Sequence, residues 1–362
     1  MGNKLKLGTF ATNLDGGFTA TTAEERHRLS WESVRRVAKL ADAAGFEMQV
    51  PLARWRSLGG VTDFCGVNYE GLAWAAGVSG VTEHSHVYAT VHVPVIHPIV
   101  AAKQMTTIDH ISGGRFGVNV VCGWFPAEFE MFGATFLDHD ARYRYAGEWI
   151  EIVRKLWTME EEFDYEGEFF KIIKGQSQPK PLRKPHPPIM QAGQSGTGLK
   201  FAAKYADIAF RAINPDETNA DVKRHFDELR RMGREEYNRS FDIWTQAWII
   251  CKPTEREANE YMDYVLGEKG DIGVLDGLPP NLVPREGPPE VLRKAQYRTL
   301  AGFGGGQIVG TPEMVAERLQ QISNAGADGV LLCWVNYEDG LRDWVQNVQP
   351  LLEQAGLREP VR

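Results

Sequence analysis

Short runs of β-forming residues alternate with segments of helical periodicity along most of the chain. Residues 116–121 form a continuous apolar run, whereas residues 31–44 carry apolar side chains at helical spacing and end before Gly45. This alternation is typical of βα units on a parallel sheet. Eight strands are predicted, at residues 5–10, 47–52, 87–93, 116–121, 189–192, 208–213, 242–251 and 330–334. Eight strands, each followed by a helix or an inserted loop, predict an α/β fold with a closed (β/α)8 TIM barrel.

Two segments interrupt this alternation. Residues 164–174 are predicted to form an inserted hairpin. Residues 267–306 contain five prolines and end in a run of three glycines. A long irregular segment inside a compact domain is usually a lid or a disordered insertion. We therefore predict one domain over residues 1–362, with residues 267–306 as a lid or an insertion.

Composition excludes several classes of function. The chain has 40 Lys and Arg against 48 Asp and Glu, a net charge of −8 and no basic run, which disfavours nucleic acid as a partner. The four cysteines form no CxxC pair, which argues against a disulfide framework or a zinc site. The chain has neither an apolar signal segment nor a stretch long enough to span a bilayer, so a cytoplasmic location without membrane contact is expected.

The histidines do not indicate a metal site, and the motifs of common catalytic and dinucleotide-binding sites are absent from the sequence. His84, His86 and His92 lie along an apolar strand without a convergent carboxylate, so they are interpreted as structural and no metal is expected. The sequence contains no HExxH, GxSxG or Walker loop, and no GxGxxG follows the first strand. A Rossmann dehydrogenase is therefore disfavoured.

Polar residues in three places are candidates for a ligand site. Residues 193–198 lead from a strand through small residues into a helix, which is a tight βα turn or an anion site at a helix N-terminus. Residues 138–143 precede another helix and are explained equally well as an N-cap cluster. Thr90 and Asn119 lie within apolar strands. A buried Asn needs hydrogen-bond partners, so Asn119 either braces the core or contacts a ligand.

Together these segments resemble the bacterial luciferase-like flavin-dependent monooxygenases. Residues 107–121 read Thr-Ile-Asp-His-Ile-Ser-Gly-Gly-Arg-Phe-Gly-Val-Asn-Val-Val, a block similar to that of the family. Gly123-Trp124, Glu128, residues 139–143 and residues 192–195 follow in the family's order. The resemblance covers about residues 5–355 and implies the same (β/α)8 barrel.

The resemblance also implies a cofactor and a set of site residues. The cofactor would be reduced FMN, with O2 as co-substrate, and a flavin peroxide would attack an electrophilic carbon of a small organic substrate. The implied FMN contacts are Ala53, Arg54, Asn119, Glu128, Arg142, Tyr143, Gly193 and Ser195. The implied oxygen pocket at the flavin N5 edge consists of Val50, Thr90, Asn119 and Trp124.

Two branches of the family resemble the chain most. Thr90 is similar to the RutA-type pyrimidine monooxygenases, which cleave a C–N bond in a uracil-like ring, whereas the dimethylsulfone monooxygenases carry Ala there. Residues 13–17, 30–32 and 123–125 are more similar to the sulfone enzymes, which cleave a C–S bond. Alkanesulfonate enzymes carry Arg-x-His on the seventh strand, where this chain has Gln246 and Trp248. Without that cation a sulfonate is disfavoured, and Gln246 and Trp248 either contact substrate or pack the barrel mouth.

The resemblance leaves the reaction partners and three alternatives to be tested. A separate NAD(P)H-dependent flavin reductase is implied because the chain has no second nucleotide-binding unit, and a homodimer or homotetramer is usual in the family. An N-heterocycle is the favoured substrate and a sulfone is the alternative. Three alternative hypotheses remain: an F420-dependent oxidoreductase, a non-catalytic flavin-binding protein and a cofactor-free barrel enzyme.

Overall fold

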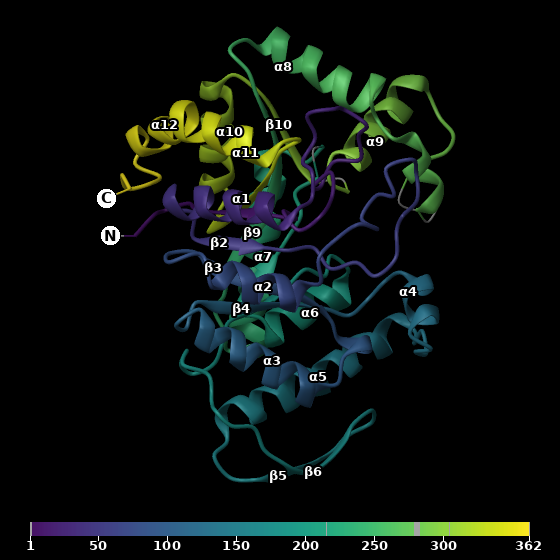
Figure 1. Cartoon of the computed structure of the whole chain (residues 1–362), viewed down its shortest axis with the longest axis vertical. Coiled ribbons are helices and arrows are strands. Elements are labelled where there is room, and N and C mark those ends of the chain that lie inside the picture. Colours follow the sequence, from purple (N-terminus) through teal and green to yellow (C-terminus); the bar gives the residue numbers. More distant parts are fainter. Residues whose placement is uncertain (1, 215, 279–282, 304, 362) are drawn as a thin grey trace.

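The main sheet closes into a barrel of eight parallel strands that helices surround (Figure 1). The computed structural model describes residues 2–214, 216–278, 283–303 and 305–361. The barrel closes because β1 pairs with both β2 and β11, and β8 pairs with β9. The barrel strands are β1 (Lys6–Phe10), β2 (Met48–Val50), β3 (His86–His92), β4 (Phe116–Val121), β7 (Ile189–Gln191), β8 (Ile208–Phe210), β9 (Asp242–Cys251) and β11 (Gly329–Cys333). The predicted eight-stranded barrel is thereby confirmed.

A ninth strand, β10 (Gly306–Gly310), joins the sheet beside β9 and was not predicted. The first residues of β9 pair with β8, from Asp242 to Trp244. The later residues of β9, from Ala247 to Cys251, pair with β10. Strands β8 and β10 therefore pair with successive parts of β9, β8 with its first residues and β10 with its last. It gives a weak sequence signal because it is short and has a glycine at each end.

Helices follow the strands and carry the sequence signals of helix ends. The helices are α1 (Trp31–Ala43), α2 (Gly71–Ser79), α3 (Pro98–Ile111), α4 (Pro126–Met131), α5 (His139–Thr158), α6 (Gly196–Tyr205), α7 (Asn219–Tyr237), α8 (Glu255–Met262), α9 (Pro289–Leu300), α10 (Pro312–Asn324), α11 (Tyr337–Asp343) and α12 (Gln349–Gln354). Asp138 caps α5 by accepting from Ala141 N, and Ser195 caps α6 by accepting from Gly198 N. Both capped ends lie in segments singled out from the sequence, so these side chains have a structural role whatever else they bind.

The predicted hairpin is present, but the segment 267–306 is more regular than predicted. Strands β5 (Phe163–Glu166) and β6 (Lys171–Gly175) pair antiparallel outside the barrel. In the later segment, the 3-10 helix η3 (Ile272–Gly277) and α9 replace the irregular chain expected there. The prolines at 279 and 280 and the glycine at 304 lie outside the described residues. A lid motion and a single domain over residues 1–362 stay predictions.

Alternation along β3 and β4 decides which side chains enter the barrel. Tyr88 belongs to the cluster inside the barrel, whereas Val87 and Val91 pack outside it with α2 and α3. A side chain at Gly117 would come within 2.4 Å of the Tyr88 ring, so the glycine makes room for this buried phenol. Because residues two apart share a face, Thr90 points into the barrel above Tyr88. None of the described helices has the length and apolar character needed to cross a membrane.

Candidate active site

Thr90 and Asn119 form a cross-strand pair inside the carboxyl end of the barrel. The two residues are directly in register on β3 and β4, and both are buried. The Asn119 amide Nδ2 donates to Thr90 Oγ1 at 3.2 Å, and Thr90 Oγ1 donates to the Pro51 carbonyl at 2.6 Å. Asn119 Oδ1 is buried and has no hydrogen-bond partner among the described residues. An orphaned buried acceptor is costly, so this oxygen is suited to a ligand that brings a donor.

A buried ion pair stands beside this cross-strand pair. Arg54 Nη1 lies 3.2 Å from Glu128 Oε2, and both side chains are about 95% buried, with exposures of 5% and 4%. The Trp55 amide donates to Glu128 Oε1 at 2.7 Å. The Arg54 guanidinium also stacks over the Trp124 ring, 4.9 Å from its centroid. Glu128 on α4 therefore holds the loop after β2 in place. The Trp124 ring, 38% exposed, covers the solvent side of the Arg54 guanidinium.

The turn between β7 and α6 brings three predicted residues together. Ser195 caps the helix, and it also shares a hydrogen bond with the Tyr143 phenol from α5. A side chain at Gly193 would come within 2.7 Å of the Tyr143 hydroxyl and 2.8 Å of Gly198 Cα. Burial raises the pKa of Tyr143, so the phenol stays protonated and able to donate. Free amides at the start of a ten-residue helix, with a hydroxyl and a phenol beside them, make a suitable site for a phosphate.

Gln194 and Arg211 support this turn and were not predicted as site residues. The Gln194 amide donates to the Ala192 and Phe210 carbonyls, both at 2.9 Å. Its Oε1 accepts from Arg211 Nη1 at 3.2 Å, and Arg211 pairs with Glu217 at 3.3 Å. The position of Arg211 directly after a barrel strand is the sequence signal that could have found it, because such residues lie at the functional end of a barrel.

Two further predicted residues are held by local contacts. Arg142 Nη1 donates to the Leu137 carbonyl at 2.9 Å, and its guanidinium lies 4.4 Å from the centroid of Phe136. Val50 is buried at the end of β2, where its carbonyl accepts from Ala11 N at 2.9 Å. Their predicted contacts with FMN and oxygen stay predictions.

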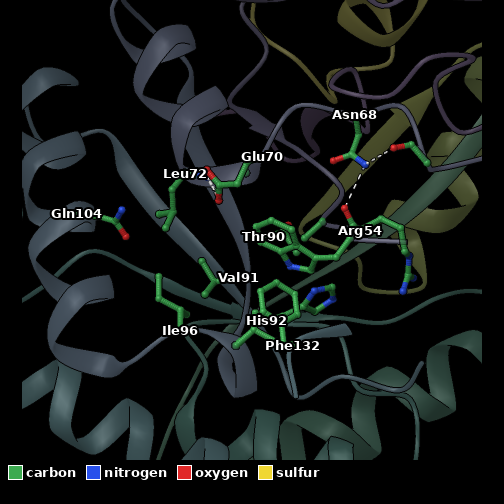
Figure 2. Close-up of a pocket in the computed structure, with 15 residues that line it drawn as sticks. Arg54, Asn68, Glu70, Leu72, Thr90, Val91, His92, Ile96, Gln104 and Phe132 are labelled. Carbon is green, nitrogen blue, oxygen red and sulfur yellow. Dashed lines mark hydrogen bonds between the residues drawn. The ribbon is translucent and has the colours of Figure 1, made fainter. Parts of the chain in front are cut away.

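A cavity of about 490 Å³ opens beside Thr90 and is lined by Ala53 and Arg54, whose contacts with FMN stay predictions. In Figure 2, Arg54 and Asn68 lie on one side of this cavity and Gln104 of α3 lies on the other, with Thr90 and His92 of β3 between them. Its volume falls in the range of about 300–1,000 Å³ that is usual for small-molecule sites.

Gln246 and Trp248 on β9 donate hydrogen bonds to other parts of the protein. Gln246 Nε2 donates to the Gly302 carbonyl at 2.9 Å, and Trp248 Nε1 donates to Thr19 Oγ1 at 2.8 Å. Both side chains are buried. These bonds favour the interpretation that the two residues pack the barrel mouth, and a contact with substrate stays a prediction.

The three histidines considered for a metal are separated along β3 and the turn before it. Burial lowers the pKa of His86 to about 4 and that of His92 to about 3, so both are neutral near pH 7. Among the described residues, no three His, Cys, Asp or Glu side chains come together in a way that could hold a metal ion.

Comparison with known proteins identifies the family. The luciferase-like monooxygenase family matches residues 5–329. The chain belongs to the luciferase-like monooxygenases. An FMNH2-dependent dimethylsulfone monooxygenase from Pseudomonas putida is 28% identical over 362 residues, which cover 98% of this chain and 97% of that enzyme. Pyrimidine monooxygenase RutA from Acinetobacter baylyi is 28% identical over 358 residues, which cover 96% of this chain and 95% of that enzyme.

A solved structure supports the fold assignment. The crystal structure of the long-chain alkane monooxygenase LadA matches with a TM-score of 0.86 at 22% identity, covering 99% of this chain and 93% of that one. The predictions of a (β/α)8 barrel and of a luciferase-like monooxygenase are thus confirmed. The two curated relatives are equally similar to this chain, so similarity alone does not choose between their substrates.

Proposed function

We propose that this chain is the oxygenase of a two-component system that uses reduced FMN and O2 to cleave a C–N bond in a small N-heterocyclic substrate. The observation that carries the proposal is the Thr90–Asn119 pair, which leaves Asn119 Oδ1 as a buried acceptor inside the barrel mouth. Reduced flavin has N–H donors on the edge of its ring system, so this acceptor fits the cofactor in the state that reacts with O2. If Asn119 Oδ1 faced only apolar side chains, no donor would be available to it.

The remaining site residues fit the other parts of FMN. The α6 N-terminus, Ser195 and the protonated Tyr143 phenol would hold the phosphate. Reduced FMN supplies the electrons that activate O2, as cofactors supply the difficult chemistry in such enzymes. The Arg54–Glu128 pair would keep the loop after β2 rigid beside the ring, and Trp124 would help to exclude water. Water exclusion protects reactive species from side reactions.

The proposed substrate class follows from the charges near the cavity. The arginine on its lining, Arg54, is neutralised by Glu128. Gln246 and Trp248 stand where alkanesulfonate enzymes carry a cation and a histidine, so a sulfonate would lack a counter-charge in this site. An uncharged N-heterocycle avoids that cost.

The proposal includes two partners. Reduced FMN would come from a separate NAD(P)H-dependent flavin reductase, because the sequence carries no GxGxxG or Walker motif of a second nucleotide-binding unit. A homodimer or homotetramer is proposed from the family resemblance. Light scattering of the purified protein would measure its oligomeric state.

A sulfone with C–S cleavage is the second candidate function. It is favoured by the Pseudomonas putida relative, which is named as a dimethylsulfone monooxygenase and matches nearly the whole chain. A sulfone is also uncharged, so it meets the same electrostatic condition in the cavity.

Rapid mixing tests both candidates and the alternatives. The FMN-loaded protein is reduced anaerobically and mixed with O2 and uracil, a flavin-like heterocycle, dimethylsulfone or an alkanesulfonate, while absorbance follows the flavin and mass spectrometry follows products. Cleavage of a heterocycle supports the proposal, and cleavage of the sulfone replaces it with the second candidate. Failure to bind FMN favours an F420-dependent oxidoreductase. Binding without any oxygenated product favours a flavin-binding protein.

A further inference from the structure

The cavity beside Thr90 has properties that the proposed reaction does not explain. It occupies about 490 Å³ between the loop after β2, strand β3, the start of α2 and Gln104 of α3 (Figure 2). Thr90 forms part of its wall and also bonds to Asn119. A ligand in this cavity would therefore contact Thr90, one member of the cross-strand pair that the proposed function assigns to the flavin edge.

The charged groups on the cavity wall already have a counter-charge or cap a helix, although Arg54 Nε itself has no hydrogen bond. The Arg54 guanidinium pairs with the buried Glu128 carboxylate at 3.2 Å. The Glu70 carboxylate caps α2, accepting from Leu72 N at 2.9 Å and Ala73 N at 2.7 Å. A carboxylate at a helix N-terminus is stabilised there by the helix dipole. The wall thus offers no unpaired charge to an ionic ligand.

His92 is a buried wall residue whose ring has no hydrogen bond within the described part of the chain. Its side chain is 7% exposed, and its Nδ1 is buried without a hydrogen bond, 4.0 Å from Glu128 Oε2. Burial and the nearby Arg54 lower the pKa of His92 to about 3, so the ring is neutral. The carboxylate beside Nδ1 favours the tautomer with its proton on Nδ1. That tautomer leaves Nε2 as a lone-pair acceptor, and no described residue donates to it.

We propose that His92 is a specificity-determining residue and that this cavity selects an uncharged substrate carrying an N–H or O–H donor, which His92 Nε2 accepts. This inference rests on the proposed function in one respect, namely that the ligand of the cavity is the substrate. A site built to hydrogen-bond a donor rejects analogues that lack it, because the buried acceptor is left unpaired. Dimethylsulfone has no such donor, and an alkanesulfonate carries a charge that the wall does not neutralise.

Equilibrium binding tests this assignment without turnover. Calorimetry on the protein saturated with oxidised FMN compares uracil and lumazine with their N,N′-dimethyl derivatives and with dimethylsulfone. We expect at least one N–H probe to bind about tenfold more tightly than its dimethylated counterpart, the value of one hydrogen bond to a buried acceptor. His92→Phe keeps a ring of similar size, and in this variant the difference between the two ligands should disappear.

A matched control separates recognition from folding. His86 lies on the same strand and the same inward face, outside the cavity wall, so His86→Phe should leave the tenfold difference unchanged. His92→Asn, which retains an acceptor, should keep part of the difference if His92→Phe does not fold. The assignment is overturned if no N–H probe binds, if the wild type does not distinguish methylated ligands, or if His92→Phe weakens both members of a pair equally.

Product analysis distinguishes this inference from the proposed function. If the N–H probe binds through His92 but is not oxygenated with reduced FMN, the cavity assignment stands and the proposed reaction fails. If an N–H heterocycle is cleaved by the wild type and equally well by His92→Phe, the proposed reaction stands and the assignment of His92 fails.

Discussion

The two sides of the barrel mouth use buried polar side chains in opposite ways. On the β3–β4 side, Asn119 Oδ1 and His92 Nδ1 have no hydrogen-bond partner in the described part of the chain. On the β9–β10 side, Gln246 and Trp248 donate to other parts of the protein at 2.9 and 2.8 Å. All four residues are buried, so burial alone does not mark a ligand contact. What distinguishes the sides is whether the protein itself satisfies the polar atom.

The largest effect is expected from the buried ion pair on the β3–β4 side. Glu128→Gln keeps an acceptor for Trp55 N but leaves the Arg54 charge buried and unpaired. Removing one member of a buried pair typically costs about 3–5 kcal/mol. We expect a fall of that size in the free energy of unfolding, measured by urea denaturation.

The control for this prediction is an exposed pair. Lys171 and Glu166 lie 3.1 Å apart with side-chain exposures of 64% and 78%, so Glu166→Gln should cause no measurable loss of stability. Equal effects of the two substitutions would show that the Arg54–Glu128 pair is solvated. The contrast between a dry β3–β4 side and the rest of the molecule would then be lost.

The second prediction concerns catalysis on the same side. Asn119→Leu removes both the acceptor and the hydrogen bond to Thr90 while keeping the side-chain volume. We expect product formation per O2 consumed to fall by about 100-fold, the value of a strong hydrogen bond in a buried site. Oxygen-electrode and product assays measure this ratio. Unchanged coupling of O2 to product would remove Asn119 from the proposed site.

Unbroken periodicity explains which parts of the fold were predicted well. The bounds of β4 and β9 agree with the sequence prediction at both ends, because each segment is an unbroken run rich in apolar residues. Helix α9 was missed because its prolines were interpreted as irregular chain. Pro289 is in fact the first residue of that helix, where proline is favoured since no backbone donor is needed.

The site was predictable only as far as residue type and strand position reveal it. Thr90 and Asn119 stand out as polar residues in apolar strands, and the structure places them side by side. Contacts between side chains that are far apart in the sequence could not be predicted in this way. Arg54 and Glu128 are 74 residues apart in sequence, and Trp248 and its partner Thr19 are 229 apart. No local pattern contains such pairings, so the sequence left open whether Trp248 binds substrate or packs the mouth.

The third prediction uses the pH dependence of stability. The folded-state pKa of His92 is about 3, below the ordinary value of 6.5, so on acidification the unfolded chain takes up a proton that the folded chain does not. The stability that His92 contributes is therefore present above pH 6.5 and is lost as the pH falls toward 3. His92→Phe should reduce the slope of unfolding free energy against pH by about 1 kcal/mol per unit in this window. An unchanged slope would show that His92 is hydrated and already titrates normally.

The smallest effect is expected on the β9–β10 side, from Gln246→Leu. This substitution removes the bond to the Gly302 carbonyl and should lower the free energy of unfolding by about 1 kcal/mol. Because that amide serves the protein and not the ligand, product formed per O2 should stay at the wild-type value. The opposite result, normal stability with poor coupling, would place Gln246 at the substrate. Both sides of the mouth would then contact the ligand, and the contrast between them would be lost.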